Sequence, residues 1–445
     1  MARSSATRGL ARRSYAEVAV EVMWPFVQGE IPREVFERIV CESYATFETE
    51  QVCPVVPLGH TAAGADLLLL ELFHGPTLAF KDVALQLVGR LFDFVLDQRQ
   101  ERICILGATS GDTGSAAIDA VRQSERIDIF ILFPEGRVSD VQRRQMSTVQ
   151  ASNVHAIAVE GTFDDCQDLV KAAFGDLAFR EEVHLGAVNS INWARVMAQI
   201  VYYVVAYLET VPQAPVDSAP AGLAAQAAEV TFCVPTGNFG NILAGWAAKQ
   251  MGLPVDRLVV ASNRNDILTR FFETGQMQIC GVVPTASPSM DIQVSSNLER
   301  LLFEVLGRDG QKVAELMAAF RSDGSVSVES EILEQLRSEF DAGRVDDDAA
   351  AVVTQAVFER TELVLDPHTA VAVALAEQLL GDPEVAVVAL ATAHPAKFPD
   401  AVEQALGFRP ELPDHLSDLF ERVERIEHVQ NDLESVQAHL RSHLS

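Results

Sequence analysis

The segment Arg102-Ile-Cys-Ile-Leu-Gly-Ala-Thr-Ser-Gly-Asp-Thr-Gly114 decides the fold class of this chain. Its apolar half, up to Gly107, has the length and composition of a buried strand, and a helix is predicted from Thr113 to Arg122. Backbone amides at the start of such a helix favour a bound anion. The segment therefore predicts an α/β protein with an anion site at the turn; a capped tight turn without a ligand is the alternative.

The turn does not match the common nucleotide-binding motifs. The dinucleotide fingerprint needs a glycine where Thr109 stands, and the P-loop needs a lysine that the turn lacks. The expected anion is therefore held in another way.

Strands and helices alternate along the chain around this segment. Further strands are predicted at residues 127–133, 154–159, 184–188, 230–234, 255–261 and 385–391. This alternation predicts a parallel sheet with helices on both faces.

Five parts are expected along the chain. They are an N-terminal helical segment packing on the body (1–75), a smaller α/β domain (76–209), an Ala- and Pro-rich linker (210–229), a larger α/β domain with a mainly helical stretch at 297–360 (230–410), and a C-terminal helical tail (411–445). The apolar stripe of the tail favours docking on the body over binding a partner helix.

The composition excludes several classes of partner. Hydrophobic residues make up 48 % of the 445 residues, enough for a large core, and the formal net charge is −29. Nucleic acid and anionic membranes need a basic surface, so neither is expected as a partner. A small-molecule substrate is expected, with the protein as a monomer or a homodimer.

The cysteines point to a reducing compartment. Six are present, with no Cys-x-x-Cys pair and no histidine at metal-ligand spacing from them, so free thiols in the cytoplasm and no metal site are predicted. No apolar run is long enough to span a bilayer, and residues 1–13 lack the apolar stretch of a secretory signal.

Two more segments carry chemistry. The loop Pro235-Thr-Gly-Asn-Phe-Gly-Asn241 also joins a strand to a helix, and its glycines let the backbone approach a phosphate. Lys81 lies among apolar residues at a predicted helix start, where burial and the helix dipole lower a lysine pKa. Such a lysine can form a Schiff base.

Together these segments resemble the threonine synthases, which belong to fold type II of the pyridoxal 5′-phosphate (PLP) enzymes. The segment from Glu71 to Asp82 (ELFHGPTLAFKD) looks like the lysine signature of the family, and its continuation Val83-Ala-Leu-Gln86 is closer to the fungal-type branch. Further matching blocks, in family order, are 108–114, 188–195, 234–241, 289–300 and 392–398. The resemblance covers residues 14 to 408 or so and implies two open, twisted, mostly parallel sheets flanked by helices.

The resemblance also implies roles for individual residues. Lys81 would hold PLP as a Schiff base and then act as acid and base. The cofactor phosphate would be cradled by Gly237, Asn238, Phe239, Gly240 and Asn241, with Asp112 near the O3′ edge and Thr392 at the pyridine nitrogen. The substrate carboxylate or phosphate would contact Thr109, Ser110 and Thr113, and the substrate phosphate would contact Asn189, Ser190, Asn192 and Arg195. Alternatives remain for Arg195 as a surface ion-pair residue and for Thr392 as a helix cap.

The implied reaction converts O-phospho-L-homoserine and water to L-threonine and phosphate. Two other outcomes stay open, a related phospho-lyase that releases 2-oxobutyrate and a PLP-binding homologue without turnover. One departure from the family bears on them: the Thr7-Arg8-Gly9 element is followed almost directly by the helix predicted from Ser14, where family members have a segment of roughly 50 residues, smaller than a typical domain. If that segment helps to cover the site, activity would be reduced or absent.

Overall fold

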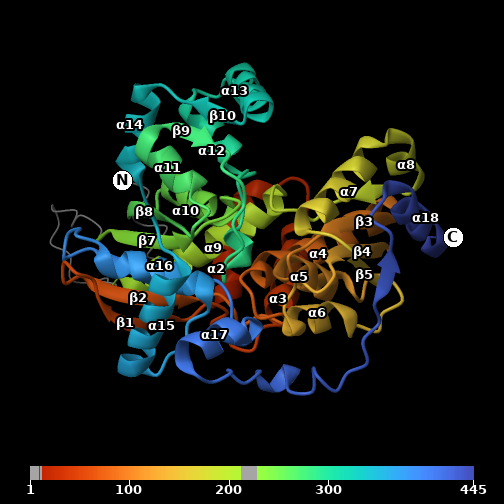
Figure 1. Cartoon of the computed structure of the whole chain (residues 1–445), viewed down its shortest axis with the longest axis horizontal. Helices are drawn as coiled ribbons and strands as arrows, with labels where there is room; N and C mark the ends of the chain where they lie inside the picture. Colours follow the sequence, from red (N-terminus) through yellow and green to blue (C-terminus); the bar gives the residue numbers. More distant parts are fainter. Residues whose placement is uncertain (1–9, 11–12, 212–227, 445) are drawn as a thin grey trace.

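The computed structural model describes residues 10, 13–211 and 228–444. It contains two main sheets, each with helices on both faces (Figure 1). Most of the linker predicted at 210–229 and the Thr7-Arg8-Gly9 element lie outside the described residues.

The larger sheet has six strands in the order β1-β2-β12-β7-β8-β11. Only β1 and β2 pair antiparallel; the other neighbours are parallel. The strands are β1 (Val55–His60), β2 (Asp66–Glu71), β7 (Val230–Pro235), β8 (Val255–Ser262), β11 (Phe340–Arg344) and β12 (Ala386–Ala391).

Alternate residues of these strands enter two separate cores. Phe232 and Val234 of β7 pack with the helices α2 (Tyr15–Val27), α3 (Arg33–Tyr44), α9 (Trp193–Thr210) and α10 (Gly240–Met251). Cys233 between them packs with α15 (Asp347–Thr361) and α16 (Pro367–Gln378). Continuous apolar strands of this kind are typical of parallel sheets that are covered on both faces.

The smaller sheet has five strands in the order β13-β5-β4-β3-β6, all parallel. They are β3 (Ile103–Ala108), β4 (Ile127–Pro134), β5 (Val154–Val159), β6 (Leu185–Gly186) and β13 (Glu427–Val429). One face is covered by α4 (Lys81–Arg99), α5 (Asp112–Val121) and α6 (Asp140–Ser147), and the other by α7 (Phe163–Gly175), α8 (Leu177–Glu182) and α18 (Leu433–His443). The two-sheet α/β fold is therefore confirmed.

A smaller subdomain, three short 3₁₀ helices and the helix α17 complete the fold. The subdomain, at the top of Figure 1, contains α11 (Ile267–Thr274), β9 (Gln276–Gln278), α12 (Leu298–Val305), α13 (Gly310–Asp323), β10 (Ser325–Ser327) and α14 (Ser330–Glu339). The remaining elements are η1 (Pro288–Met290), η2 (Pro395–Lys397), α17 (Pro399–Leu406) and η3 (Asp414–Leu416).

The structure corrects the secondary structure expected in three segments. The N-terminal segment is not wholly helical, because β1 and β2 belong to the larger sheet. The stretch 297–360 contributes the edge strand β11 to the same sheet. The tail is not a continuous helix: it runs along the lower side of the molecule in Figure 1 and adds β13 to the smaller sheet before α18 begins.

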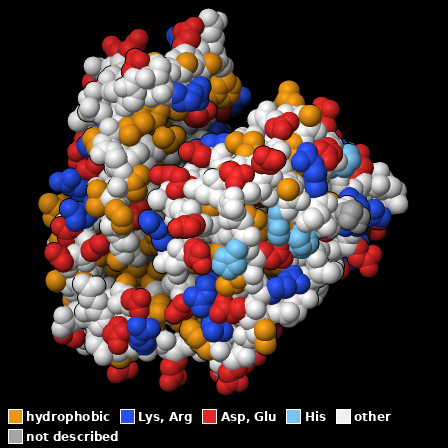
Figure 2. Space-filling model, turned by 45° about the vertical axis from the view of Figure 1, so that its right-hand side comes forward, with side chains coloured by type: hydrophobic (Ala, Val, Ile, Leu, Met, Phe, Trp, Pro, Cys, Tyr) orange, Lys and Arg blue, Asp and Glu red, His pale blue; other side chains and the backbone are white. Residues whose placement is uncertain are grey.

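Acidic side chains are spread over the face shown in Figure 2, with Lys and Arg side chains between them. Among the described residues, no helix combines the length and the apolar character needed to cross a bilayer.

Candidate active site

Lys81 is the first residue of α4, and the end of β12 fixes the segment before it. The backbone N–H of Phe80 donates to the carbonyl of Thr392 (2.9 Å), and the N–H of His394 donates to the carbonyl of Leu78 (3.0 Å). The larger sheet therefore positions the lysine at the start of a helix that covers the smaller sheet.

The carboxylate of Asp112 lies between two buried lysines. Lys81 Nζ donates to Oδ2 (2.9 Å), and Lys397 Nζ lies 3.1 Å from Oδ1. Gln142 Nε2 donates to Oδ1 as well (2.9 Å). Burial by itself would raise the pKa of Asp112, but the charges of Lys397 and Lys81 hold it well below its ordinary value. Asp112 is therefore an ionised group in the interior.

The amine of Lys81 is prepared to lose its proton. Burial lowers its pKa from the ordinary value, and the charges of Lys397 and Arg195 act in the same direction, although Asp112 opposes them. The side chain is 9 % exposed, and Nζ also lies 3.4 Å from Ser289 Oγ. A neutral amine in this position is the nucleophile that a Schiff base requires.

The turn after β3 is held rigidly by its own side chains. Gly111, the residue before α5, has φ +134°, and a Cβ there would lie within 2.5 Å of the side chain of Gln142. Thr109 Oγ1 accepts hydrogen bonds from the N–H groups of Gly111 (2.9 Å) and Gly114 (2.8 Å). The predicted substrate residue Thr109 thus shapes the turn, whereas Ser110 and Thr113 are half-buried on it.

The loop after β7 lies on the other side of Ser289. A Cβ on Gly237 would lie 2.4 Å from the Ser289 carbonyl oxygen, so glycine permits this close approach. Phe239, with φ +61°, ends the loop, and α10 begins at Gly240. Because Ser289 contacts both Lys81 and Gly237, the lysine and the loop belong to one site.

Asn241, the second residue of α10, has a side-chain donor without a partner among the described residues. Its Oδ1 accepts hydrogen bonds from the hydroxyls of Tyr202 (2.5 Å) and Tyr203 (2.9 Å). Its Nδ2 is buried and unpaired among the described residues. An unpaired amide and a helix N-terminus fit a phosphate group, so the loop suits the phosphate of PLP.

Arg195 carries an unbalanced charge in the interior. It is 3 % exposed, and burial lowers its pKa to about 10. One nitrogen, Nη1, donates to the carbonyl of Val188 (3.0 Å), while Nε has no partner among the described residues. A buried guanidinium is costly unless an anion pairs with it, so the alternative role as a surface ion-pair residue is wrong.

The segment before Arg195 reaches across to the phosphate loop. Asn192 caps α9 through Oδ1, which accepts from the N–H of Ala194 (2.9 Å). Ser190 Oγ lies 3.1 Å from Ser296 Oγ, and Asn297 Nδ2 donates to the carbonyls of both Ser190 (3.2 Å) and Asn238 (3.0 Å). Asn189 is exposed beside it. Asn297 therefore connects the two predicted anion sites.

Sequence reasoning gave no role to several residues of this site. Lys397 is wholly buried, and its Nζ donates to the carbonyl of Thr77 (2.5 Å). His368 Nε2 accepts from the Ser289 N–H (3.2 Å), while Nδ1 pairs with Asp366 (2.8 Å). Ser289 and Lys397 stand in segments that matched family blocks, which was the only available signal for them.

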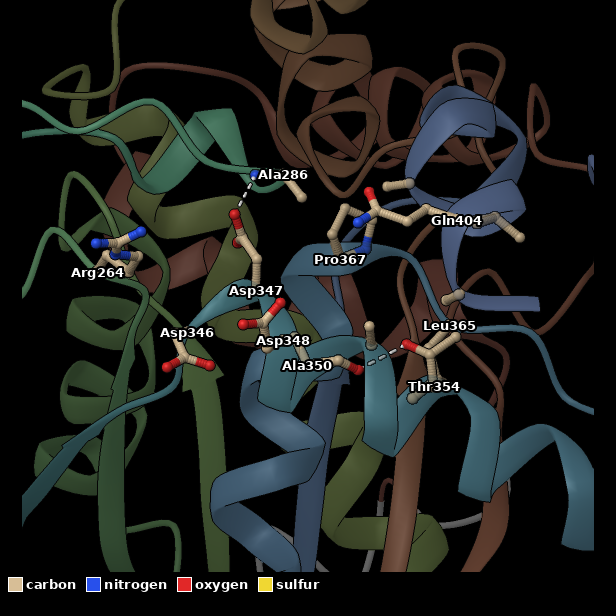
Figure 3. Close-up of a pocket in the computed structure, with 14 residues that line it drawn as sticks. Arg264, Ala286, Asp346, Asp347, Asp348, Ala350, Thr354, Leu365, Pro367 and Gln404 are labelled. Atoms are coloured by element: carbon tan, nitrogen blue, oxygen red, sulfur yellow. Dashed lines mark hydrogen bonds between the residues drawn. The ribbon is translucent and has the colours of Figure 1, made fainter. Parts of the chain in front are cut away.

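A cavity shown in Figure 3 lies apart from these residues. It measures about 280 Å³ and is lined from α15, α16 and α17, with Asp346, Asp347 and Asp348 on one side. Its lining contains none of the predicted site residues. The position of Lys81 and its partners, and not this cavity, defines the candidate active site.

Family models of PLP-dependent enzymes and threonine synthases match this chain, and threonine synthases are among its relatives and the solved structures that resemble it. Residues 47–392 match the family model described as pyridoxal-phosphate dependent enzyme, and residues 369–440 match that of the threonine synthase C-terminal region. A threonine synthase from Pseudomonas aeruginosa is 50 % identical over 430 residues, which cover 96 % of this chain and 88 % of that protein. A PLP-bound threonine synthase structure from Brucella melitensis superposes with a TM-score of 0.89 at 51 % identity, covering 98 % of this chain and 90 % of the other. The yeast threonine synthase structure gives 0.88 at 39 % identity, with 98 % and 89 % covered.

Proposed function

The chain belongs to the threonine synthase family of PLP-dependent enzymes, and from that premise we propose how its own residues convert O-phospho-L-homoserine and water to L-threonine and phosphate. The observation that carries the proposal is the buried Lys81 amine, 2.9 Å from the carboxylate of Asp112.

The cofactor site consists of the loop 237–241 and Lys81. The Asn241 amide and the first N–H groups of α10 would bind the PLP phosphate, and the Lys81 amine would attach to the aldehyde. Thr392, at the end of β12, would contact the pyridine nitrogen, and Asp112 would face the O3′ edge. Bound PLP supplies an electron sink for the carbanions formed beside the substrate amine.

The substrate phosphate would be bound by Arg195 together with Asn189, Ser190 and Asn192. The guanidinium offers Nε, which is buried without a partner, so a phosphate oxygen would satisfy it with a charge-assisted hydrogen bond. The substrate carboxylate would bind at the N-terminus of α5, where it would contact Ser110, Thr113 and Thr109.

Lys81 would carry the protons. Once the substrate amine had displaced it, its amine would take a proton from Cα and pass it to the substrate phosphate, then take one from Cβ while phosphate leaves from Cγ with the bonding electrons. Lys81 would then return the Cβ proton to Cγ, take a proton from the water that adds at Cβ, and deliver that proton to Cα. Asp112, 2.9 Å from Nζ, keeps the amine oriented through these transfers.

The location and assembly of the enzyme are part of the proposal. All six cysteines are free thiols, four of them buried, which supports a reducing, cytoplasmic compartment. We propose a monomer or a homodimer.

The test is to identify the product formed from O-phospho-L-homoserine by the purified, PLP-loaded protein in D₂O. Threonine with deuterium at Cα and Cγ, released together with one phosphate, is expected. Release of 2-oxobutyrate would instead indicate the phospho-lyase. An unchanged substrate with a normal cofactor spectrum would indicate a homologue without turnover.

A further inference from the structure

A cluster of histidines surrounds one glutamate at the edge of the smaller sheet. His155 lies on β5, Glu427 on the neighbouring strand β13, and His439 and His443 on α18, next to the C-terminus in Figure 1. None of these residues belongs to the site around Lys81, and folding brings them together from positions up to 288 residues apart in the chain (443 − 155).

Their ligand atoms are at the spacing that a small metal ion needs. His155 Nδ1 lies 3.1 Å from Glu427 Oε1, and His443 Nε2 lies 3.9 Å from Glu427 Oε2. One ligand atom from each of the three residues lies within 4.8 Å of the others. Zinc bonds of about 2.0–2.2 Å in tetrahedral geometry place ligand atoms about 3.3–3.5 Å apart, so small side-chain movements suffice.

Contacts with neighbouring groups orient the rings of His443 and His155. His443 Nδ1 lies 3.0 Å from the carbonyl of His439, which can only accept, so a proton on Nδ1 would leave the lone pair of Nε2, 3.9 Å from Glu427 Oε2, free for a metal ion. A backbone carbonyl bound to the other ring nitrogen is typical of metal-binding histidines. The ring of His155 is 6 % exposed at its side chain and stacks on Phe130, with centroids 4.3 Å apart and planes at 8°.

We propose that His155, Glu427 and His443 form a site for a divalent transition metal, best suited to zinc, with His439 at its edge. Two imidazoles and one carboxylate are a ligand set that zinc accepts. His439 Nε2 contacts Glu427 Oε2, so it either orients the carboxylate or becomes the fourth ligand.

The site would have a structural role. Its ligands come from β5, which is in the body of the smaller sheet, and from β13 and α18, which form the end of the tail. A metal ion here would fasten that tail to the sheet. The end of the tail is also held by the three-residue strand β13, by Val436 and Leu440 of α18, and by the ion pair of Arg441 with Glu182.

The test is a zinc titration of tag-free, PLP-loaded protein that has been stripped with a chelator, using a chromophoric competitor and metal analysis. One equivalent should bind to the wild type and raise the unfolding temperature. His443→Gln should lower the affinity by at least about 100-fold, because loss of an outer partner alone costs up to about that much. His428→Gln is the matched control, since this exposed neighbour on β13 lies near Glu135 instead, and its zinc affinity should equal that of the wild type.

Glu427→Gln serves as a second variant that keeps the size of the side chain and one of its two acceptor oxygens, and it too should bind zinc weakly. Cobalt substitution adds an independent readout. A spectrum without thiolate charge transfer is expected, whereas such a band would assign the metal to Cys41 or Cys280 and overturn the proposal. Equal zinc binding by the wild type and both cluster variants, or no binding by the wild type, would leave Glu427 as a carboxylate that only accepts hydrogen bonds from three imidazoles.

Discussion

Two lysines share the carboxylate of Asp112, but their surroundings give them different tasks. Lys397 is wholly buried, and its ammonium group also donates to the Thr77 carbonyl. It is therefore held in place by its hydrogen-bond partners. Lys81 donates to Asp112, lies 3.4 Å from the hydroxyl of Ser289 and lies over the ring of Phe80, and its pKa is lowered by burial. Lys397 therefore holds the charge of Asp112 in place, while Lys81 is the amine that can react.

Replacing the reactive lysine tests this division. Lys81→Ala should remove the visible absorption of the lysine-bound cofactor and lower turnover by at least about 10⁴-fold, because proton transfer alone contributes up to about that factor. Absorption spectra and steady-state rates measure both effects. Lys171→Ala, at an exposed position of α7, should match the wild type. Retained turnover in Lys81→Ala would refute the assignment.

Replacing the second lysine should affect stability first. Lys397→Met keeps the volume of the side chain but leaves Asp112 with one cationic partner fewer. Removing one partner of a buried ion pair costs about 3–5 kcal/mol, so the free energy of unfolding in urea should fall by about this much. Lys312→Met, on the exposed side of α13, is the control and should unfold like the wild type. An unchanged free energy for Lys397→Met would show that Lys397 does not stabilise Asp112.

Arg195→Met should weaken binding at the substrate-phosphate site and leave binding at the PLP-phosphate site unchanged. Loss of a charge-assisted hydrogen bond costs about 1.5–3 kcal/mol, so KM for phosphohomoserine should rise by about 10–100-fold while the PLP affinity stays the same. Since no carboxylate pairs with Arg195 among the described residues, the variant should be at least as stable as the wild type. An equal loss of PLP and substrate binding would contradict the phosphate role.

At the scale of elements, the glycine loop after β7 depends on close backbone contact. Gly237→Ala would place a Cβ 2.4 Å from the backbone oxygen of Ser289, which cannot move aside as a side chain could. The loop must shift instead, and PLP affinity should fall at least about tenfold, the equivalent of one lost hydrogen bond near 1.4 kcal/mol. Gly175→Ala, where a Cβ would meet no atom within 4 Å, is the control. Equal cofactor affinity in both variants would argue against binding of the PLP phosphate by the loop 237–241.

The elements that sequence analysis predicted best are those with long apolar runs. Strand β3, the turn after it and α4 follow directly from their local pattern. Strand β13 could not be predicted, because its residues Glu427, His428 and Val429 have no apolar alternation and form a strand only by pairing with the edge of β5. Tertiary context decides such short strands more than propensity does.

The same limit applies to the site. Lys81 and the anion loops have local signatures, and the structure brings Lys81 and Asp112 together. Ser289 is 208 residues from Lys81 and Lys397 is 320 residues from Thr77, so no local pattern could reveal those contacts. The roles assigned to the individual substrate residues remain predictions.

At the scale of the whole molecule, the C-terminal segment connects the parts. Leu416 and Leu419 pack with Leu78, three residues before Lys81, and with Val141 of α6. Arg143 of α6 forms a two-pronged pair with Glu424, with distances of 2.9 and 3.1 Å. The segment thus packs on the residues just before Lys81 and then reaches the smaller sheet, so the predicted tail docks on the body although it is not one helix.

The stability of the whole fold should depend on pH through His394. Burial and the charge of His74 lower its pKa to about 4, below the ordinary value of 6.5. Above pH 6.5 the imidazole is neutral in both folded and unfolded protein, so the fold keeps its full stability. Between pH 6.5 and 4 only the unfolded chain binds the proton, so stability falls with decreasing pH by about 3 kcal/mol in total.

His394→Asn isolates this contribution. His394 Nδ1 accepts from the N–H of Ala396 (3.1 Å) at the start of η2, and asparagine can replace that cap. Urea unfolding of the PLP-loaded proteins at several pH values should show a slope for the wild type that is steeper by up to about 1.4 kcal/mol per pH unit. Asp82, whose pKa burial raises to about 6, has the opposite effect below that pH, but it is present in both proteins and cancels in the comparison. Identical slopes would mean that His394 takes up its proton in the folded protein as readily as in the unfolded chain.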